Sequence, residues 1–231
     1  MKLFKYEFYH LILDRAVWAV LMAIIALGLL IAYAGRHNFI GIPVEGIIPL
    51  ILCNPFLTMW TGVVLAPVFF GLDFQNRTLN IAVSSGYSRI KIFITKVFLY
   101  YLYGILVLFI SNVCMVWISC GNLSFIRLGE KFVLLPLIYC ATITIPMLMY
   151  FIFNDMFAAT AINVIFTFTM QRLMENEIVS DIMFVYPPCL QMNILTLSTW
   201  TEIFTSILIN GIYIVIGSSI CIYALKTREL K

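Results

Sequence analysis

The stretch VFLYYLYGILVLFISNVCMVWISC, residues 97–120, decides the fold class of this chain. It holds no charged residue, and as a helix rising about 1.5 Å per residue it is long enough to cross the roughly 30 Å hydrocarbon core of a membrane. The rest of the chain is similar, because 63% of its 231 residues are hydrophobic and only 11% are charged. A soluble domain carries about 25% charged residues. The sequence therefore predicts an all-α polytopic membrane protein.

Outward from this stretch, charged residues divide the chain into seven apolar windows. One window, residues 182–201, contains the adjacent Pro187 and Pro188, which remove two backbone donors and break a helix. Broken backbone survives at membrane depth only where protein or water covers it. Residues 182–200 are therefore predicted to form an outer re-entrant element. The other windows predict six transmembrane helices, at about residues 16–35, 47–71, 97–120, 132–153, 156–174 and 203–225.

Two of these spans have irregular sequences. The second contains Pro55 and Pro67, which predict a kinked helix. The fifth reaches spanning length only when it is extended through Arg172, whose long side chain can place its charge at the interface. Asn154 and Asp155 are the only polar break between the fourth and fifth spans, and they predict a tight hairpin.

Six spans put both termini on one side of the membrane, and the basic residues predict that this side is the cytoplasm. Ten basic residues then lie inside: Lys2, Lys5, Arg15, Arg77, Arg89, Lys91, Lys96, Lys226, Arg228 and Lys231. Four lie outside: Arg36, Arg127, Lys131 and Arg172. A topology with seven spans would move the last three basic residues outside and weaken this asymmetry. Six spans with cytoplasmic termini is therefore the preferred topology.

The N-terminal residues 1–15, MKLFKYEFYHLILDR, are aromatic and charged. On a helix, Phe4 and Phe8 share one face, whereas Glu7 and Asp14 share another. This pattern is typical of a helix that lies along the membrane interface before the first span. A simple extension of the first helix, with charges that only set the topology, explains the segment equally well.

Several kinds of chemistry are absent from the sequence. No GxxxxGK[ST] loop is present to bind the phosphates of ATP. The six cysteines show no paired metal-ligand spacing, and the net charge of +3 indicates no nucleic-acid partner. No span carries a charged residue at its centre, which disfavours a proton pump or an ion-coupled carrier. We therefore expect no catalytic residue, metal or cofactor in this chain, and an energy source outside it.

The segment DFQNRTLNIAVSSGYSRIKIFITK, residues 73–96, is the longest segment of the predicted cytoplasmic face. Asp73 and Arg77 have the i,i+4 spacing that supports a helix. Gly86 can adopt the positive φ that ends a helix, and Ser88 can cap the next one. These features predict a helix, a turn and a second helix. Physical reasoning alone leaves an ordinary connector with topogenic charges equally open.

The segment resembles the cytoplasmic loop of ABC-2-type transporter permeases, the six-span subunits of ABC exporters in bacitracin-, lantibiotic- and multidrug-type systems. The matching residues are Asp73, Thr78, Leu79, Ser84, Gly86, Ser88, Arg89 and Lys96. The N-terminal segment resembles the elbow helix of that family, with Glu7 near the place where members often carry a glutamate. Asn80 departs from the family, because many members have Lys or Arg there.

The resemblance implies that the whole chain is one transmembrane domain, with residues 73–96 as its coupling segment. The residues implied to contact an ATPase subunit are Asp73, Thr78, Leu79, Gly86, Ser88 and Arg89, with Glu7 in the elbow helix. The implied partners are two copies of a separate ATPase subunit, which bind ATP and Mg²⁺, and a second permease, either identical or different. Membrane lipid would surround the complex in a bacterial plasma membrane. The implied activity is export of an amphipathic or peptide-like substrate.

Two other functions stay open from the sequence. A membrane assembly or sensor-partner protein could bind its partners through the same loop without transporting anything. An intramembrane enzyme would need polar catalytic residues inside the spans. Ser111, Asn112 and Asn163 are the candidates, but the sequence shows no partner for them.

Overall fold

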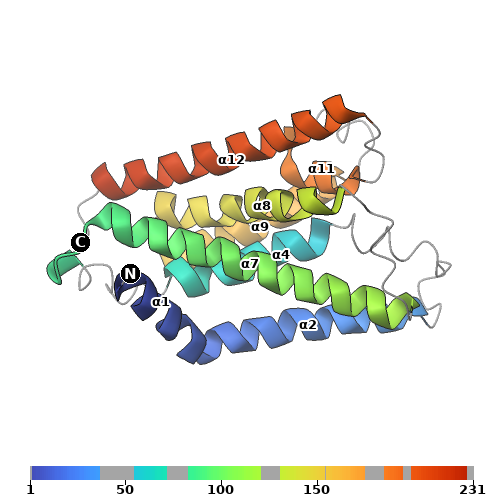
Figure 1. The fold of residues 1–231 in the computed structure, drawn as a ribbon, viewed down its shortest axis with the longest axis horizontal. Helices are drawn as coiled ribbons and strands as arrows, with labels where there is room; N and C mark the ends of the chain where they lie inside the picture. The colour runs from blue at the N-terminus through green and yellow to red at the C-terminus, as the bar shows by residue number, and fades with distance from the viewer. Residues whose placement is uncertain are drawn as a thin grey trace.

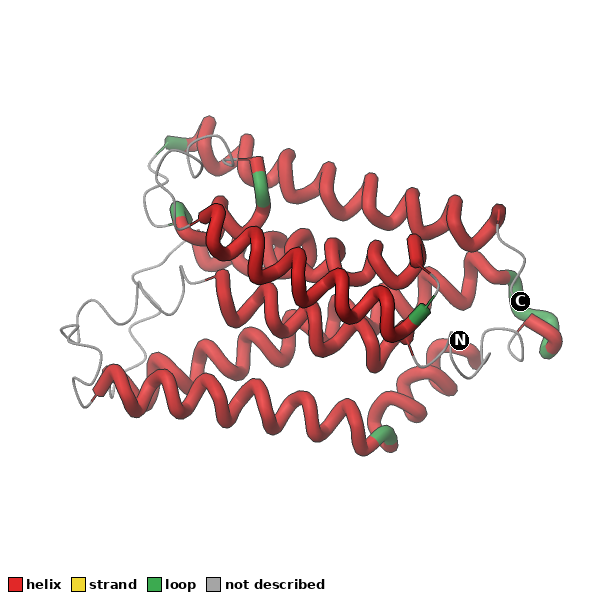
Figure 2. Tube along the Cα trace, turned by 180° about the vertical axis from the view of Figure 1, so that it is seen from behind, coloured by secondary structure: helices red, strands yellow, loops and turns green. Residues whose placement is uncertain are grey.

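The structure, a computed structural model, describes residues 2–36, 55–71, 83–120, 131–153, 155–174, 185–194 and 199–227. The elements within these ranges are all helical (Figures 1 and 2). They are α1 (Lys2–Leu13), α2 (Arg15–Arg36), α4 (Pro55–Ala66), the π-helix η1 (Pro67–Gly71), α7 (Arg89–Cys120), α8 (Lys131–Phe153), α9 (Met156–Met174), α11 (Pro187–Met192) and α12 (Trp200–Thr227).

The helices run in alternating directions along one axis. From α2 through α4, α7, α8 and α9 to α12, each helix is antiparallel to the one before it in the chain (Figure 1). As a result, α1, the start of α7 and the last turn of α12 lie at one end of the bundle, here called the α1 end. The short helix α11 lies at the opposite end, called the α11 end (Figure 1). The described parts of the predicted coupling segment and of the predicted re-entrant element are therefore at opposite ends.

By length and composition, three helices in the described ranges can cross a membrane: Arg89–Cys114, Leu134–Phe153 and Trp200–Thr227. A fourth results if α1 and α2, which meet at a 60° bend, are counted as one span. Helices α4 and η1 form a shorter apolar segment at the position of the second predicted span, whose residues 47–54 lie outside the described residues. Helix α9 occupies the position of the fifth. The total of six spans stays a prediction.

Short polar side chains define several helix ends. Asp14 separates α1 from α2, and its Oδ1 accepts a hydrogen bond from the backbone N–H of Ala16 at 2.9 Å. Asp155 caps α9 in the same way through Phe157, at 2.7 Å, so the predicted tight connection between α8 and α9 is confirmed. Thr199 and Glu202 form a reciprocal capping box at the start of α12. Helix α9 continues through Arg172 to Met174, as predicted.

Proline produces different local structures in different helices. In the second predicted span, the helix changes at Pro67 from α to the π-helix η1. The kink predicted for this span stays a prediction. In α8, Pro136 and Pro146 lie inside a helix that continues past them. Pro187 and Pro188 instead open α11, where the missing N–H groups need no helical partner.

Helix α8 lies at the centre of the bundle and contacts α4, α7, α9, α11 and α12. Three glycines on neighbouring helices allow this close packing. A Cβ atom on Gly62 of α4 would lie 3.3 Å from the Cα of Ile143, and one on Gly104 of α7 would lie 2.6 Å from the Cδ1 of the same residue. A Cβ atom on Gly217 of α12 would meet Thr144. One turn of α8 is therefore contacted by glycines of three helices.

Tyrosine hydroxyl groups on α7 add directional contacts to this apolar packing. Tyr100 donates to the carbonyl oxygen of Ile143 at 2.8 Å, and Tyr101 shares a hydrogen bond of 2.7 Å with Thr144. On another side of α7, Tyr103 donates to the carbonyl oxygen of Val17 in α2 at 2.7 Å. Buried hydroxyl groups need such partners, and these bonds fix α7 against both α8 and α2.

Candidate functional site: the α1 end of the bundle

The turn at Ser85 and Gly86 has the conformation that the sequence predicts. Val83 and Ser84 are helical, and the N–H of Gly86 donates to the carbonyl oxygen of Val83 at 3.0 Å. Gly86 has a φ of 89°, in the left-handed region that glycine occupies without strain. The helix that precedes the turn therefore ends sharply here.

Ser88 begins the next helix, also as predicted. Its Oγ accepts a hydrogen bond from the backbone N–H of Lys91 at 3.3 Å, and its carbonyl oxygen accepts one from Ile92 at 3.1 Å. The sequence predicted a second helix after the turn and a span from about residue 97. The structure shows that both belong to one uninterrupted helix from Arg89 to Cys120. Only Tyr87 and Ser88 separate the turn at Gly86 from this helix.

The turn and the start of α7 form an exposed surface. Ser84, Ser85, Gly86, Ser88 and Arg89 are all exposed. The Lys91 ammonium group lies 6.0 Å from the centre of the Tyr87 ring, within the range of a cation–π contact. The surface is therefore polar and basic, and it projects at the α1 end of the bundle (Figure 1).

Helix α1 is attached to this region by an ion pair. Lys96 Nζ on α7 lies 3.2 Å from Glu7 Oε2 on α1, and the two side chains are only 16% and 12% exposed. The ring centres of Phe4 and Phe98 lie 6.0 Å apart beside it. The two residues of the pair are also two of those that carry the family resemblance.

The position of Glu7 corrects one expectation about α1. The sequence placed Glu7 on a polar face directed away from the apolar one. In the structure Leu3 and Glu7 face the bundle, whereas Phe4 and Phe8 are 41% and 38% exposed. The physical reason is the ammonium group of Lys96, which compensates the carboxylate and allows it to be largely buried. Helical periodicity alone could not reveal this, because the partner lies on another helix.

Part of the predicted coupling site lies outside the described residues. Asp73, Thr78 and Leu79 are in this group, so the predicted helix before the turn and the Asp73–Arg77 pair are not described. Gly86, Ser88 and Arg89 lie together at the start of α7, and Glu7 lies against the same helix one to two turns further along. Sequence reasoning missed the pairing of Glu7 with Lys96. The signal that could have indicated it was two opposite charges on the same predicted side of the membrane.

The α11 end contains the described part of the predicted re-entrant element. Helix α11 has six residues, and its first five, Pro187, Pro188, Cys189, Leu190 and Gln191, are buried against α4, α8 and α12. It is too short to span a membrane. Among the described residues, no three His, Cys, Asp or Glu side chains gather into a group that could hold a metal ion. The free cysteines Cys114, Cys140, Cys189 and Cys221 lie on four different helices, α7, α8, α11 and α12.

Comparison of this chain with protein-family models, with curated proteins and with solved structures found no match.

Proposed function

We propose that this chain is the transmembrane permease subunit of an ATP-driven exporter of the ABC-2 type, with six spans and cytoplasmic termini in a bacterial plasma membrane. Two copies of a separate ATPase subunit would bind at the α1 end, and a second permease, identical or different, would complete the path. The substrate would be amphipathic or peptide-like, such as an antimicrobial peptide or a drug. The observation that carries the proposal is the exposed turn at Gly86, which lies two residues before the start of the long helix α7.

A displacement of the turn at Gly86 can reach α7, because only Tyr87 and Ser88 separate Gly86 from a helix that runs unbroken from Arg89 to Cys120. The Glu7–Lys96 pair then carries α1 along with α7. Helix α2 follows as well, because Tyr103 of α7 donates a hydrogen bond to the carbonyl oxygen of Val17. Rigid-body motion of this kind is how domain closure in one protein changes the packing of another.

The proposal is tested first by purification of the full-length chain, with an affinity tag, from its native membranes. We expect an ATPase subunit to co-purify, in two copies per complex. The Arg89→Glu variant should lose most of this ATPase, at least about tenfold, because reversal of a charge at an interface disfavours the partner. Arg89→Lys, which keeps the charge, is the matched control. The docking role is wrong if Arg89→Glu retains the ATPase as well as the native chain does.

A second experiment separates transport from simple assembly. Gly86→Pro forces φ to about −65°, which the turn cannot accept. If the chain is a permease, cells with this variant should lose tolerance to a peptide antibiotic such as bacitracin although the protein remains in the membrane. An assembly or sensor-partner protein would instead give the same tolerance in cells with the native chain and in cells that lack it.

A further inference from the structure

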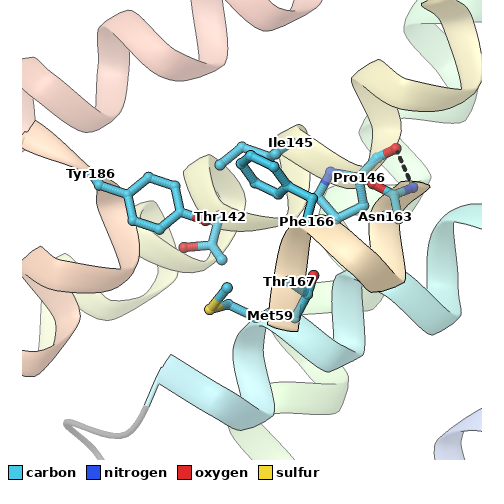
Figure 3. A pocket seen from close by; sticks show the side chains of 8 residues that line it. All are labelled: Met59, Thr142, Ile145, Pro146, Asn163, Phe166, Thr167 and Tyr186. Carbon is cyan, nitrogen blue, oxygen red and sulfur yellow. Dashed lines mark hydrogen bonds between the residues drawn. The ribbon is translucent and has the colours of Figure 1, made fainter. Parts of the chain in front are cut away.

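A small cavity lies between α4, α8, α9 and Tyr186, the residue that precedes α11 (Figure 3). Its volume of about 10 Å³ is close to the minimum that holds one water molecule. Four polar residues line it: Thr142 on α8, Asn163 and Thr167 on α9, and Tyr186 before α11. Met59 and Phe166 are among the apolar residues of its wall.

Two buried oxygen atoms in this cavity have no hydrogen-bond partner among the described residues. They are Thr142 Oγ1 and Asn163 Oδ1, in residues that are 2% and 1% exposed. The other end of the Asn163 amide is fixed, because its Nδ2 donates to the carbonyl oxygen of Pro146 at 3.2 Å (Figure 3). Pro146 has no N–H, so the carbonyl group of Thr142 also lacks its usual helical donor. A buried polar atom without a partner costs about 1–3 kcal/mol.

The direction of Tyr186 indicates how the Thr142 end of the cavity is filled. Figure 3 shows the ring of Tyr186 extending from the α11 side with its hydroxyl end toward Thr142. No direct hydrogen bond joins these two side chains in the described structure, because Thr142 Oγ1 has no protein partner. An apolar cavity of this size would stay dry, whereas one lined by polar atoms takes up water.

We propose that one ordered water molecule occupies the Thr142 end of the cavity and hydrogen-bonds to the hydroxyl groups of Thr142 and Tyr186. The water satisfies Thr142 Oγ1, and it connects the central helix α8 to the segment that enters α11. Nothing larger than water fits the space as it stands. The proposal is independent of any transport activity, because it concerns only how the re-entrant helix is held.

The sign of a stability change tests this proposal. Thr142→Val removes the hydroxyl with little change of shape. If the water is present, the variant of the full-length chain in detergent should have a Tm lower by about 2–4 °C, which corresponds to the loss of about 1 kcal/mol in a chain of this size. If the cavity is dry, the same variant removes an unpaired buried hydroxyl and its Tm should rise. A rise would overturn the proposal.

A double-mutant cycle tests whether the water is shared. Tyr186→Phe should also lower Tm, and Thr142→Val with Tyr186→Phe should lower it no further than the larger single effect. The matched control is Thr61→Val, since Thr61 is equally buried but its hydroxyl donates to the carbonyl oxygen of Leu57 at 2.6 Å within α4. Its effect should add to that of Tyr186→Phe. Additive effects for Thr142 and Tyr186 would exclude a shared water.

The direct observation is an experimental structure of the full-length chain at a resolution that shows ordered water. We expect a density peak about 2.7–2.8 Å from both hydroxyl oxygens. An empty cavity at that resolution, or a direct contact between the two hydroxyl groups, would overturn the proposal.

Discussion

At the scale of single residues, Gly217 shows how closely α12 approaches the central helix. The space next to it is filled by Thr144 of α8, whereas a Cβ atom on Gly211 of the same helix would meet nothing within 4 Å. Gly217→Val should therefore lower the free energy of unfolding by about 1–3 kcal/mol, the usual cost of overpacking a core. Gly211→Val is the control and should change it by less than about 0.5 kcal/mol. Thermal unfolding of the two purified variants measures the difference, and equal effects would contradict the close packing.

The Glu7–Lys96 pair is also a property of single residues. Either Glu7→Lys or Lys96→Glu should destabilise the attachment of α1, because each leaves two like charges at a largely buried site. The exchanged double variant restores opposite charges, and we expect it to recover about 0.5–3 kcal/mol as a coupling free energy. Unfolding of all four forms in the same detergent gives this value. A coupling of zero would show that the pair does not hold α1 to α7.

At the scale of helices, the boundary between α1 and α2 depends on Asp14. Its carboxylate accepts the hydrogen bond from Ala16 that begins α2. Asp14→Ala should cost about 0.5–2 kcal/mol, the usual range for a lost N-cap. Asp14→Asn keeps an acceptor and should stay close to the native value. Thermal unfolding distinguishes them, and equal stability of the native chain and Asp14→Ala would mean that the bend is held by other contacts.

Helix ends could be predicted from the sequence where they depend on residues close to one another in the chain. The cap at Ser88, the turn at Gly86 and the extension of α9 past Arg172 all depend on residues within one turn of each other. The inward direction of Glu7 was not predictable in this way. The close packing at Gly104 and Gly217 was also missed, because neither glycine belongs to a GxxxG pair. These features depend on residues of other helices, about which one sequence gives no direct information.

At the scale of the whole molecule, the alternating directions of the helices predict which surfaces face opposite sides of the membrane. Ser85 is exposed at the α1 end, and Met192 is exposed at the α11 end. In a variant without native cysteines, Ser85→Cys should react with a membrane-impermeant maleimide only in inside-out vesicles. Met192→Cys should react only in intact cells. Labelling of both from the same side would contradict the six-span topology.

The sequence predicted the all-helical class correctly, because uncharged windows of spanning length are a strong signal. Of its six predicted spans, three correspond to described helices that are long and apolar enough to cross a membrane. It predicted the coupling site only in part. The local geometry of Gly86, Ser88 and Arg89 followed from cap chemistry, whereas the role of that surface depended on a family resemblance. The cavity at Thr142 was not predicted at all, since it arises where α4, α8, α9 and the α11 segment meet.

The short helix α1 has a consequence for how force can travel through the bundle. It is joined to α2 by the chain at Asp14 and to α7 by the Glu7–Lys96 pair, while Tyr103 joins α7 back to α2 at Val17. Each of the three helices is thus connected to the other two, so none can shift relative to the others unless one of these connections breaks. We therefore expect helices α1, α2 and α7 to move together as one unit. The hydrogen bonds of Tyr100 and Tyr101 connect this unit to α8, so the proposed partner at the Gly86 turn would act on α8 through these two tyrosines.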